Sequence, residues 1–260
     1  MEIPIYQVDA FTRRQFAGNP AAICPLDTWL PDETLQAIAA ENNLAETAYF
    51  VRKGDRYHLR WFTPAIEVPL CGHATLASAH VLFENLGYQG DRIVFETKSG
   101  DLVVTRQGDR LCLDFPSQPP SRCEPHPRLI EGLGAQPLEI LAARYYLAVY
   151  ATQDDVRALQ PNFQVLAALD RLGIIVTAPG HDVDFVSRFF APAAGINEDP
   201  VTGSAHCTLT PYWSRRLGKK SLTARQISTR GGDLWCEDCG DRVLLAGYAA
   251  PYLKGLIRVG

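Results

Sequence analysis

Two short segments of this chain place a polar or nucleophilic side chain directly before a glycine. They are Cys71-Gly72-His73 and Thr202-Gly203-Ser204, and each precedes a stretch that is predicted to be helical. The N-terminus of a helix presents unpaired N–H groups and a partial positive charge, which favour anions, and glycine lets a ligand approach the backbone closely. The two segments therefore predict binding points for a carboxylate. The alternative is that both glycines only allow a tight start of the helix.

Glu46 is a candidate for acid and base chemistry. It lies between the end of a predicted helix and a predicted strand, next to the small or apolar residues Leu44, Ala45 and Ala48. A carboxylate that takes a proton from one carbon and returns it to another carbon of the same molecule catalyses an isomerisation. Taken alone, a glutamate at such a position is more often a solvated surface residue.

An internal duplication sets the architecture that must position these residues. Residues 97–113 and 229–245 share eight identities in a 17-residue stretch, where average composition predicts about one by chance. Further matching segments follow the same order, with offsets that increase from 128 to 132: residues 60–65 with 188–193, and residues 69–72 with 200–203. A repeat of this length is a domain rather than a solenoid unit. We therefore expect function where the two related halves no longer match.

Each half is predicted to run in the order strand, helix, strands, central helix and strand meander. The central segment that follows Gly72 is small or apolar on nearly all sides, which predicts a helix inside its domain. In the second half, Pro211 is expected to kink or restart the matching helix. The proline-rich segment 116–127 is typical of an interdomain linker. The predicted first-half elements are strands 3–8, 47–51, 58–62, 93–97, 102–106 and 111–115, with a helix from residue 31 to 42.

The composition favours small or neutral partners. The 260 residues are 47% hydrophobic, and 25 basic residues stand against 29 acidic ones, for a net charge of −4. No basic run supports binding to a nucleic acid or to an anionic membrane, and no apolar run is long enough to span a bilayer. The N-terminus lacks the pattern of a secretory leader, and the seven cysteines are scattered. We therefore expect a cytoplasmic protein with reduced thiols.

The chain resembles the phenazine biosynthesis PhzF-like family. The resemblance is carried by Asn43-Leu44-Ala45-Glu46-Thr47-Ala48, by Cys71-Gly72-His73-Ala74-Thr75 and by Asn197-Glu198-Asp199-Pro200-Val201-Thr202-Gly203-Ser204-Ala205-His206, and it extends essentially from end to end. It implies an α+β fold like that of diaminopimelate epimerase, with two domains related by a pseudo-twofold axis and a curved sheet wrapped around a central helix in each. We expect domains at 1–118 and 128–260, a linker at 119–127 and an active site in the cleft between the domains.

The resemblance also implies roles for particular residues. Glu46, His73 and Asp199 match the catalytic residues of the family, and Gly72, Gly203 and Ser204 match its substrate-binding positions. It further implies a homodimer, for which the exposed edges of the meanders are a second indication. The expected partner is a small carboxylic acid.

Two-base epimerases of the same fold use a pair of cysteines, each just before the glycine that begins a central helix. Here one position holds Cys71 and the other holds Thr202. A thiol pair is therefore not available, which favours a mechanism with one carboxylate. Cys71 could assist as a thiol with a lowered pKa at a helix N-terminus, or it could be a small packed core residue. Glu46 has no equivalent in the second half, where Leu172 falls near the matching position.

No strong motif for a metal or a cofactor is present. Cys236 and Cys239 form one CxxC pair without a partner pair, which is weak support for zinc. His73 and His80 are seven residues apart, and His80 is expected to be packed. No nucleotide-binding glycine pattern follows a strand. We expect an enzyme that needs neither a metal nor a cofactor.

Three functions follow as hypotheses. The first is an isomerase that moves a proton within a small cyclic or amino-acid-like carboxylic acid, as in trans-2,3-dihydro-3-hydroxyanthranilate isomerisation. The second is an epimerase or racemase of amino or hydroxy acids that uses Glu46 against Cys71 or Asp199. The third is a family member that binds a small acid or a protein without turnover.

Overall fold

The computed structural model describes all residues from Met1 to Gly260. The contacts divide the chain into two compact units, Met1–Asp114 with Ala246–Gly260, and Phe115–Leu245. The C-terminus belongs to the first unit because β18 (Ala249–Arg258) pairs antiparallel along the whole of β1 (Glu2–Ala10). The boundaries expected from the sequence, 1–118 and 128–260, differ from this division mainly in that last strand.

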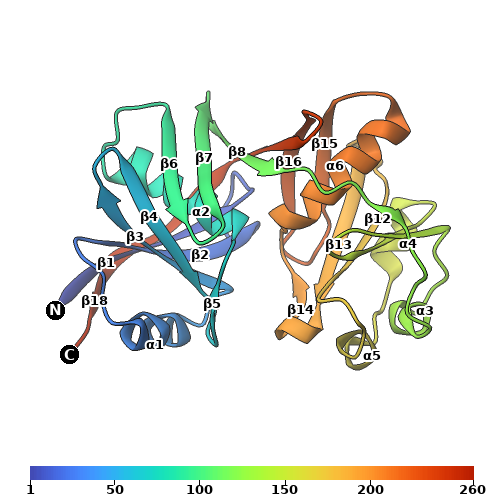
Figure 1. Cartoon of the computed structure of the whole chain (residues 1–260), viewed down its shortest axis with the longest axis horizontal. Coiled ribbons are helices and arrows are strands. Elements are labelled where there is room, and N and C mark those ends of the chain that lie inside the picture. The colour runs from blue at the N-terminus through green and yellow to red at the C-terminus, as the bar shows by residue number, and fades with distance from the viewer. The chain divides into compact units, whose positions relative to one another are not determined.

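The first unit is a mixed sheet whose strands follow the order β18, β1, β2, β3, β4, β6, β7 and β8 (Figure 1). The β2–β3 and β4–β6 pairs are parallel and the others are antiparallel. Helices cross between the partners of each parallel pair, as parallel pairing requires. The remaining elements are β2 (Asn19–Leu26), α1 (Asp32–Asn42), β3 (Glu46–Lys53), β4 (Arg56–Phe62), β5 (Glu67–Val68), α2 (Gly72–His80), the π-helix η1 (Val81–Asn85), β6 (Arg92–Thr97), β7 (Gly100–Gln107) and β8 (Arg110–Pro116).

Helix α2 is the centre of the first unit, as its apolar composition predicts. It packs against β1, β2, β3, β7 and β18, and strands are drawn around it in Figure 1. Every residue from His73 to Ala79 is buried. The small side chains of this helix let the strands approach from several sides, so the sheet curves around it.

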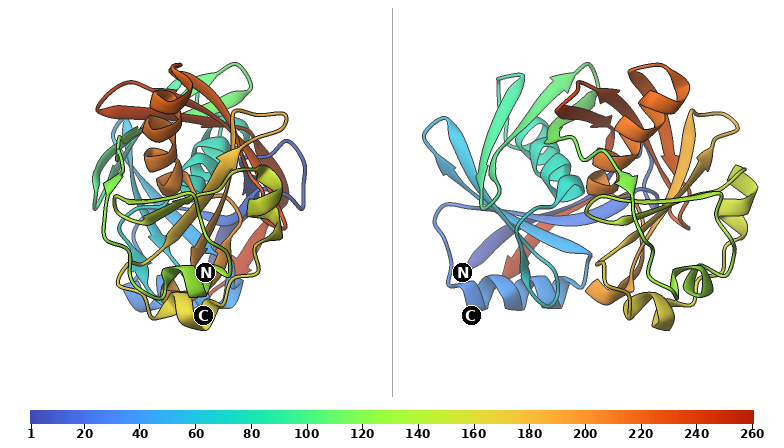
Figure 2. Two further views of the ribbon diagram at one scale, coloured as in Figure 1. Left: turned by 90° about the vertical axis from the view of Figure 1, so that its right-hand side faces the viewer. Right: turned by 45° about the vertical axis from the view of Figure 1, so that its right-hand side comes forward.

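The second unit repeats this plan. Its strands follow the order β9, β10, β11, β12, β13, β15 and β16, and the β11–β12 and β13–β15 pairs are parallel. The central helix α6 packs against β15 and β16 (Figure 2). The elements are β9 (Ser121–Arg122), α3 (Leu129–Leu133), β10 (Glu139–Ala142), β11 (Tyr146–Val149), α4 (Gln153–Ala158), α5 (Phe163–Ala167), β12 (Ile174–Pro179), β13 (Phe185–Ala191), the 3-10 helix η2 (Pro192–Ala194), β14 (Ile196–Asp199), α6 (Gly203–Leu217), β15 (Ser221–Gln226), β16 (Gly232–Asp238) and β17 (Arg242–Gly247).

The pairing patterns establish the duplication at the level of topology. In each unit a parallel pair, an antiparallel pair and a second parallel pair follow in the same order, from β2 to β6 and from β11 to β15. A short additional strand also recurs in each unit, because β5 pairs with the end of β4 and β14 pairs with the end of β13. Helices together with mixed sheets make an α+β fold, as predicted. None of the helices is both long enough and apolar enough to cross a membrane.

The proline-rich segment expected as a linker is part of the second unit. Its strand β9 pairs with β10, and the backbone N–H of Ser117 donates to the carbonyl of Asp241. Prolines remove donors from this segment, but the N–H groups of Ser117 and Gln118 find acceptors in the unit. The segment 119–127, expected as an interdomain linker, thus lies within the second unit.

The sequence predicted a kink or a restart of the helix at Pro211, and α6 continues through this residue as one helix without a restart. Proline lacks the N–H that would bond the carbonyl four residues earlier, which here is that of Cys207. The backbone N–H of Gln118 donates to this carbonyl at 3.0 Å. A segment distant in sequence thus replaces the missing helical hydrogen bond, which no local pattern could indicate.

Candidate active site

Glu46 is the first residue of β3, directly after the turn that ends α1. Asn43 closes the helix with φ of 49°, a left-handed conformation that asparagine tolerates, and its N–H bonds the carbonyl of Ala39. The side chain of Asn42 then donates to the hydroxyl of Thr47 at 3.1 Å. In the parallel pair, Glu46 lies opposite Ala21 of β2. The turn and the sheet register together fix the position of the carboxylate.

The carboxylate of Glu46 contacts the imidazole of His73. The Glu46 Oε2 and His73 Nε2 atoms are 3.1 Å apart, and the side chains are only 13% and 6% exposed. On the other edge of the ring, His73 Nδ1 lies 3.5 Å from the Cys71 sulfur. The structure thus brings together Glu46 and His73, two of the predicted catalytic residues. Together with Cys71 they form a row of three side chains, in which the imidazole of His73 lies between the carboxylate and the sulfur.

The charges in this row follow from burial and proximity. Burial disfavours a charged His73, but the Cys71 sulfur, which can accept a hydrogen bond from one ring nitrogen, and the Glu46 charge beside the other nitrogen favour it, and the pKa of His73 is raised well above its ordinary value. Burial, with the nearby Glu46 charge, raises the pKa of Cys71 to about 11. The thiol is therefore neutral at neutral pH, and Glu46 is the charge that keeps His73 protonated. The thiol is not the activated one that a helix N-terminus could have produced.

The same three residues could in principle hold a metal ion. Their ligand atoms lie within 4.8 Å of one another. However, the two ring nitrogens of His73 face different partners, Nδ1 the sulfur and Nε2 the carboxylate. One cation can use only one of these nitrogens, so a cation bound to all three residues would interrupt at least one of these two contacts. Neither His80 nor the Cys236–Cys239 pair belongs to this group.

An arginine–glutamate pair anchors the segment before each central helix. Arg60 bonds both carboxylate oxygens of Glu67, at 2.8 and 2.9 Å, and Arg188 does the same to Glu198, at 2.7 and 3.0 Å. Each glutamate stands four residues before the N-cap residue of its helix, Cys71 or Thr202. Bidentate pairs of this kind fix direction as well as distance. They orient the two short strands that lead to the site residues.

Asp199, the third predicted catalytic residue, ends β14 and is 8% exposed. The hydroxyl of Thr202 bonds its Oδ2 atom. The amide of Gln226 donates to the backbone carbonyl of Asp199 at 2.7 Å and to the Thr202 hydroxyl at 3.1 Å. Asp199, Thr202 and Gln226 thus form one buried network at the start of α6.

Ser204 lies one residue after Gly203 at the start of α6. Its hydroxyl is 3.2 Å from the hydroxyl of Tyr145. Neither Gly72 nor Gly203 has a positive φ, so the backbone conformation does not itself require glycine at these positions.

The position that matches Glu46 in the second unit has no side chain. Thr47 is paired with Phe62 and Ile174 with Phe190, and Phe62 and Phe190 correspond in the repeat. Gly173, rather than Leu172, is therefore the counterpart of Glu46. A Cβ at Gly173 would come within 2.4 Å of the Phe189 ring, so aromatic packing fills the equivalent space.

Several of these residues escaped the sequence analysis. The two arginine–glutamate pairs lie at matching positions of the repeat, and extending that alignment to the glutamates would have found them. Tyr145 and Gln226 gave no signal. Gln226 lies at the end of β15, far from any motif, and only the pairing of strands brings it to Thr202.

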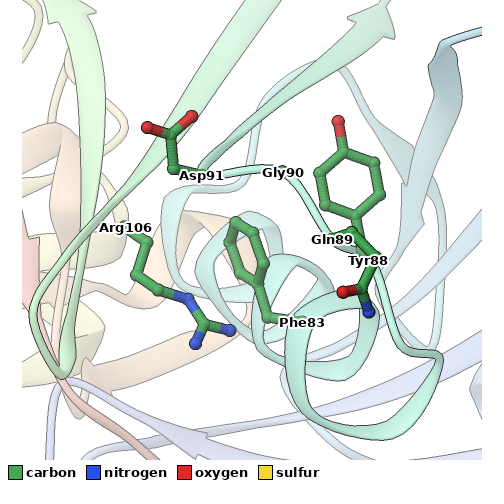
Figure 3. A pocket seen from close by; sticks show the side chains of 6 residues that line it. All are labelled: Phe83, Tyr88, Gln89, Gly90, Asp91 and Arg106. Carbon is green, nitrogen blue, oxygen red and sulfur yellow. The ribbon is translucent and has the colours of Figure 1, made fainter.

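A surface pocket of about 390 Å³ also lies in the first unit, beside the π-helix η1 (Figure 3). The guanidinium of Arg106 lies 4.4 Å from the centre of the Phe83 ring and bonds Glu84 at 2.8 Å. The hydroxyl of Tyr88 donates to the carbonyl of Arg92. The pocket contains none of the predicted site residues, and its Arg106 and Tyr88 side chains already have partners outside the lining, Glu84 and Arg92.

Comparisons with known proteins agree with the fold. The family profile described as phenazine biosynthesis-like protein matches residues 8–255. An uncharacterized isomerase of Pseudomonas aeruginosa is 53% identical over 260 residues, with both chains fully covered. The crystal structure of a phenazine biosynthesis protein of the PhzF family from Enterococcus faecalis aligns with a TM-score of 0.97 at 46% identity, again over the whole of both chains.

More distant structures share the fold alone. A hydroxyproline epimerase from Agrobacterium vitis aligns with a TM-score of 0.59 at 10% identity, over 98% of this chain and 92% of its own. This likeness confirms the predicted epimerase-like fold. The profile match and the closely similar relatives establish that the chain belongs to the phenazine biosynthesis-like protein family, and the relative named an isomerase supports an isomerase class.

Proposed function

We propose that this protein is an isomerase that moves a proton between two carbons of a small carboxylic acid, without a metal or a cofactor. The observation that carries the proposal is the buried pair of Glu46 and His73, with 3.1 Å between carboxylate and imidazole. A carboxylate in this setting can accept a proton from carbon, and a protonated imidazole beside it can share and return it.

The reaction balances without a further reactant. Glu46 takes a proton from an allylic carbon of the cyclic acid, and the electrons of the broken C–H bond enter a shifted double bond. The proton then returns to another carbon of the same ring, where a new C–H bond forms. No electrons are gained or lost, so no redox partner is needed. Trans-2,3-dihydro-3-hydroxyanthranilate is a substrate of this chemical type.

We assign the substrate's polar groups to the helix starts. The backbone N–H groups at Gly72 and Gly203 suit a carboxylate, and the Ser204 hydroxyl suits a hydroxyl or amino group. Asp199, buried and oriented by Thr202, suits the positioning of a substrate amine or hydroxyl. These assignments extend the family resemblance and stand as proposals.

An epimerase or racemase is the second candidate, supported by the fold it shares with the hydroxyproline epimerase. The burial of Cys71 opposes this candidate, because a thiol with a pKa of about 11 is a poor partner for Glu46 in two-base inversion. An epimerase that uses Asp199 as the second base would avoid that objection.

Solvent-deuterium incorporation tests the proposal. The protein is incubated in D₂O with trans-2,3-dihydro-3-hydroxyanthranilate, and recovered acids are analysed by mass spectrometry and NMR. We expect deuterium at carbon and a product with a shifted double bond. A label at an inverted stereocentre, with the double bonds unchanged, would indicate an epimerase. Binding without any label would contradict catalysis on this acid.

A further inference from the structure

The network around Asp199 has a fixed direction of hydrogen bonding. The backbone N–H of Thr202 donates to Gln226 Oε1 at 2.9 Å, which determines which end of the amide is oxygen. The other end, Nε2, therefore faces the Thr202 hydroxyl and the Asp199 carbonyl, at 3.1 and 2.7 Å. An amide nitrogen can only donate.

As a consequence, the hydroxyl proton of Thr202 can be donated in only one direction. Because Thr202 Oγ1 accepts a hydrogen bond from Gln226, its own proton points to its remaining partner, Oδ2 of Asp199. Gln226 is fully buried, and Thr202 and Asp199 are each 8% exposed. Water competes little for such bonds, so a misdirected hydroxyl would leave a buried polar group without a partner.

We propose that Thr202 and Gln226 are positioning residues that fix the orientation of the Asp199 carboxylate. The proposal rests on the role that the proposed function gives to Asp199. It also explains the divergence of the halves: Cys71 contacts His73 in the first unit, and Thr202 bonds Asp199 in the second. In this proposal, the residue before the glycine that begins each central helix contacts a candidate catalytic residue, and the two do not act as a pair of opposed thiols.

The test uses a matched set of variants. Thr202→Val keeps the side-chain shape and removes the donor, whereas Thr202→Ser keeps the donor. Thr208→Val is the control, because it deletes another buried hydroxyl of α6, one without a hydrogen-bond partner. With trans-2,3-dihydro-3-hydroxyanthranilate as the probe, we expect Thr202→Val to lower kcat about 10- to 100-fold, the usual effect of a lost bond to a charged group. KM should change less than kcat.

The conservative variant separates positioning from packing. Thr202→Ser should recover kcat to within about threefold of the native value, since its hydroxyl can make the same bonds. Thr208→Val should leave kcat unchanged. Native kcat in Thr202→Val, or an equal loss in Thr202→Ser and Thr202→Val, would overturn the proposal.

A second readout does not depend on turnover. Aspartate labelled with ¹³C at its side-chain carboxyl is incorporated, and the Asp199 resonance is assigned as the one absent from Asp199→Asn. We expect it to move in Thr202→Val and to stay near its native position in Thr202→Ser and Thr208→Val. An unmoved resonance in Thr202→Val would overturn the inference. Failure of the native protein to act on the probe would instead count against the proposed function, and the resonance would still decide the inference.

Discussion

His73 has a close partner on each edge of its ring, and these partners determine its charge. The Glu46 carboxylate at Nε2 favours the imidazolium, while the Cys71 thiol at Nδ1 is held neutral by burial. A proton can therefore pass between His73 and Glu46 but not readily to Cys71. The residue types alone would allow a thiol mechanism, and it is the burial of the sulfur that opposes it.

We expect His73 to be an imidazolium in the folded protein at pH 7.5. Its pKa is raised well above the ordinary 6.5 by charges that overcome burial. Its contribution to the free energy of unfolding is thus complete below pH 6.5 and is lost as the pH rises through the folded pKa. Imidazole ¹⁵N NMR should show two protonated ring nitrogens at pH 7.5. A neutral His73 in that spectrum would contradict the assigned charges, and Glu46→Gln should shift the ring toward the neutral form.

His206 is expected to limit stability in acid. Burial lowers its pKa from 6.5 to about 4, and its Nδ1–H donates to the carbonyl of Thr202 at 2.8 Å. The unfolded chain binds the proton more tightly, so the free energy of unfolding should fall by about 3 kcal/mol between pH 6.5 and pH 4. The free energy of unfolding is measured by urea denaturation at pH 7 and at pH 4.5. The difference between the two pH values should be smaller for His206→Asn than for the native protein, because asparagine can donate a hydrogen bond but cannot titrate. Equal differences in both proteins would refute this assignment.

At the scale of elements, the central helices and the meanders were predictable because their signals are local. Apolar residues on all sides of α2 indicated its burial, and the turns of the meander were visible in the sequence. Elements set by distant contacts were not predictable. The pairing of β18 with β1 joins the two ends of the chain, and the proline-rich segment found its acceptors in residues more than 80 positions away, Asp241 and Cys207.

The same reasoning holds for the candidate site. The motif residues Glu46 and His73 could be named in advance, and their direct contact follows from the sheet that surrounds α2. Gln226 could not be named, because an amide at the end of a strand carries no distinctive pattern and acts only through its partners. Sequence reasoning thus finds the candidate catalytic residues more readily than the residues that contact them.

Pro211 provides a test of compensation within one element. A proline in a helix interior is usually about 3 kcal/mol less favourable than alanine. Because Gln118 already bonds the Cys207 carbonyl, we expect Pro211→Ala to raise the free energy of unfolding by less than about 1 kcal/mol in urea denaturation. A gain near the full 3 kcal/mol would mean that the contact of Gln118 does not offset the lost helical bond.

At the scale of the whole molecule, the two halves keep their topology and differ in their chemistry. The first unit has Glu46 at the start of β3, whereas the second has Gly173 and aromatic packing at the matching point. The first has Cys71 before its central glycine, and the second has Thr202. A mechanism with one base is expected to have its carboxylate in only one of the two halves. A mechanism with two thiol bases would need a cysteine in each half, and only one is present at these positions.

The central claim is that Glu46 transfers the proton and that Cys71 does not. The most direct measurement is kcat for Glu46→Gln and Cys71→Ala, compared in one assay, with ligand affinity and melting temperature as controls for binding and folding. Glutamine keeps the shape and most hydrogen bonds of Glu46 but cannot transfer the proton, so turnover should fall by about 10² to 10⁴, with affinity retained. Cys71→Ala should reduce turnover far less. A crippling loss in Cys71→Ala with a mild one in Glu46→Gln would contradict the one-carboxylate mechanism and favour a cysteine-based epimerase.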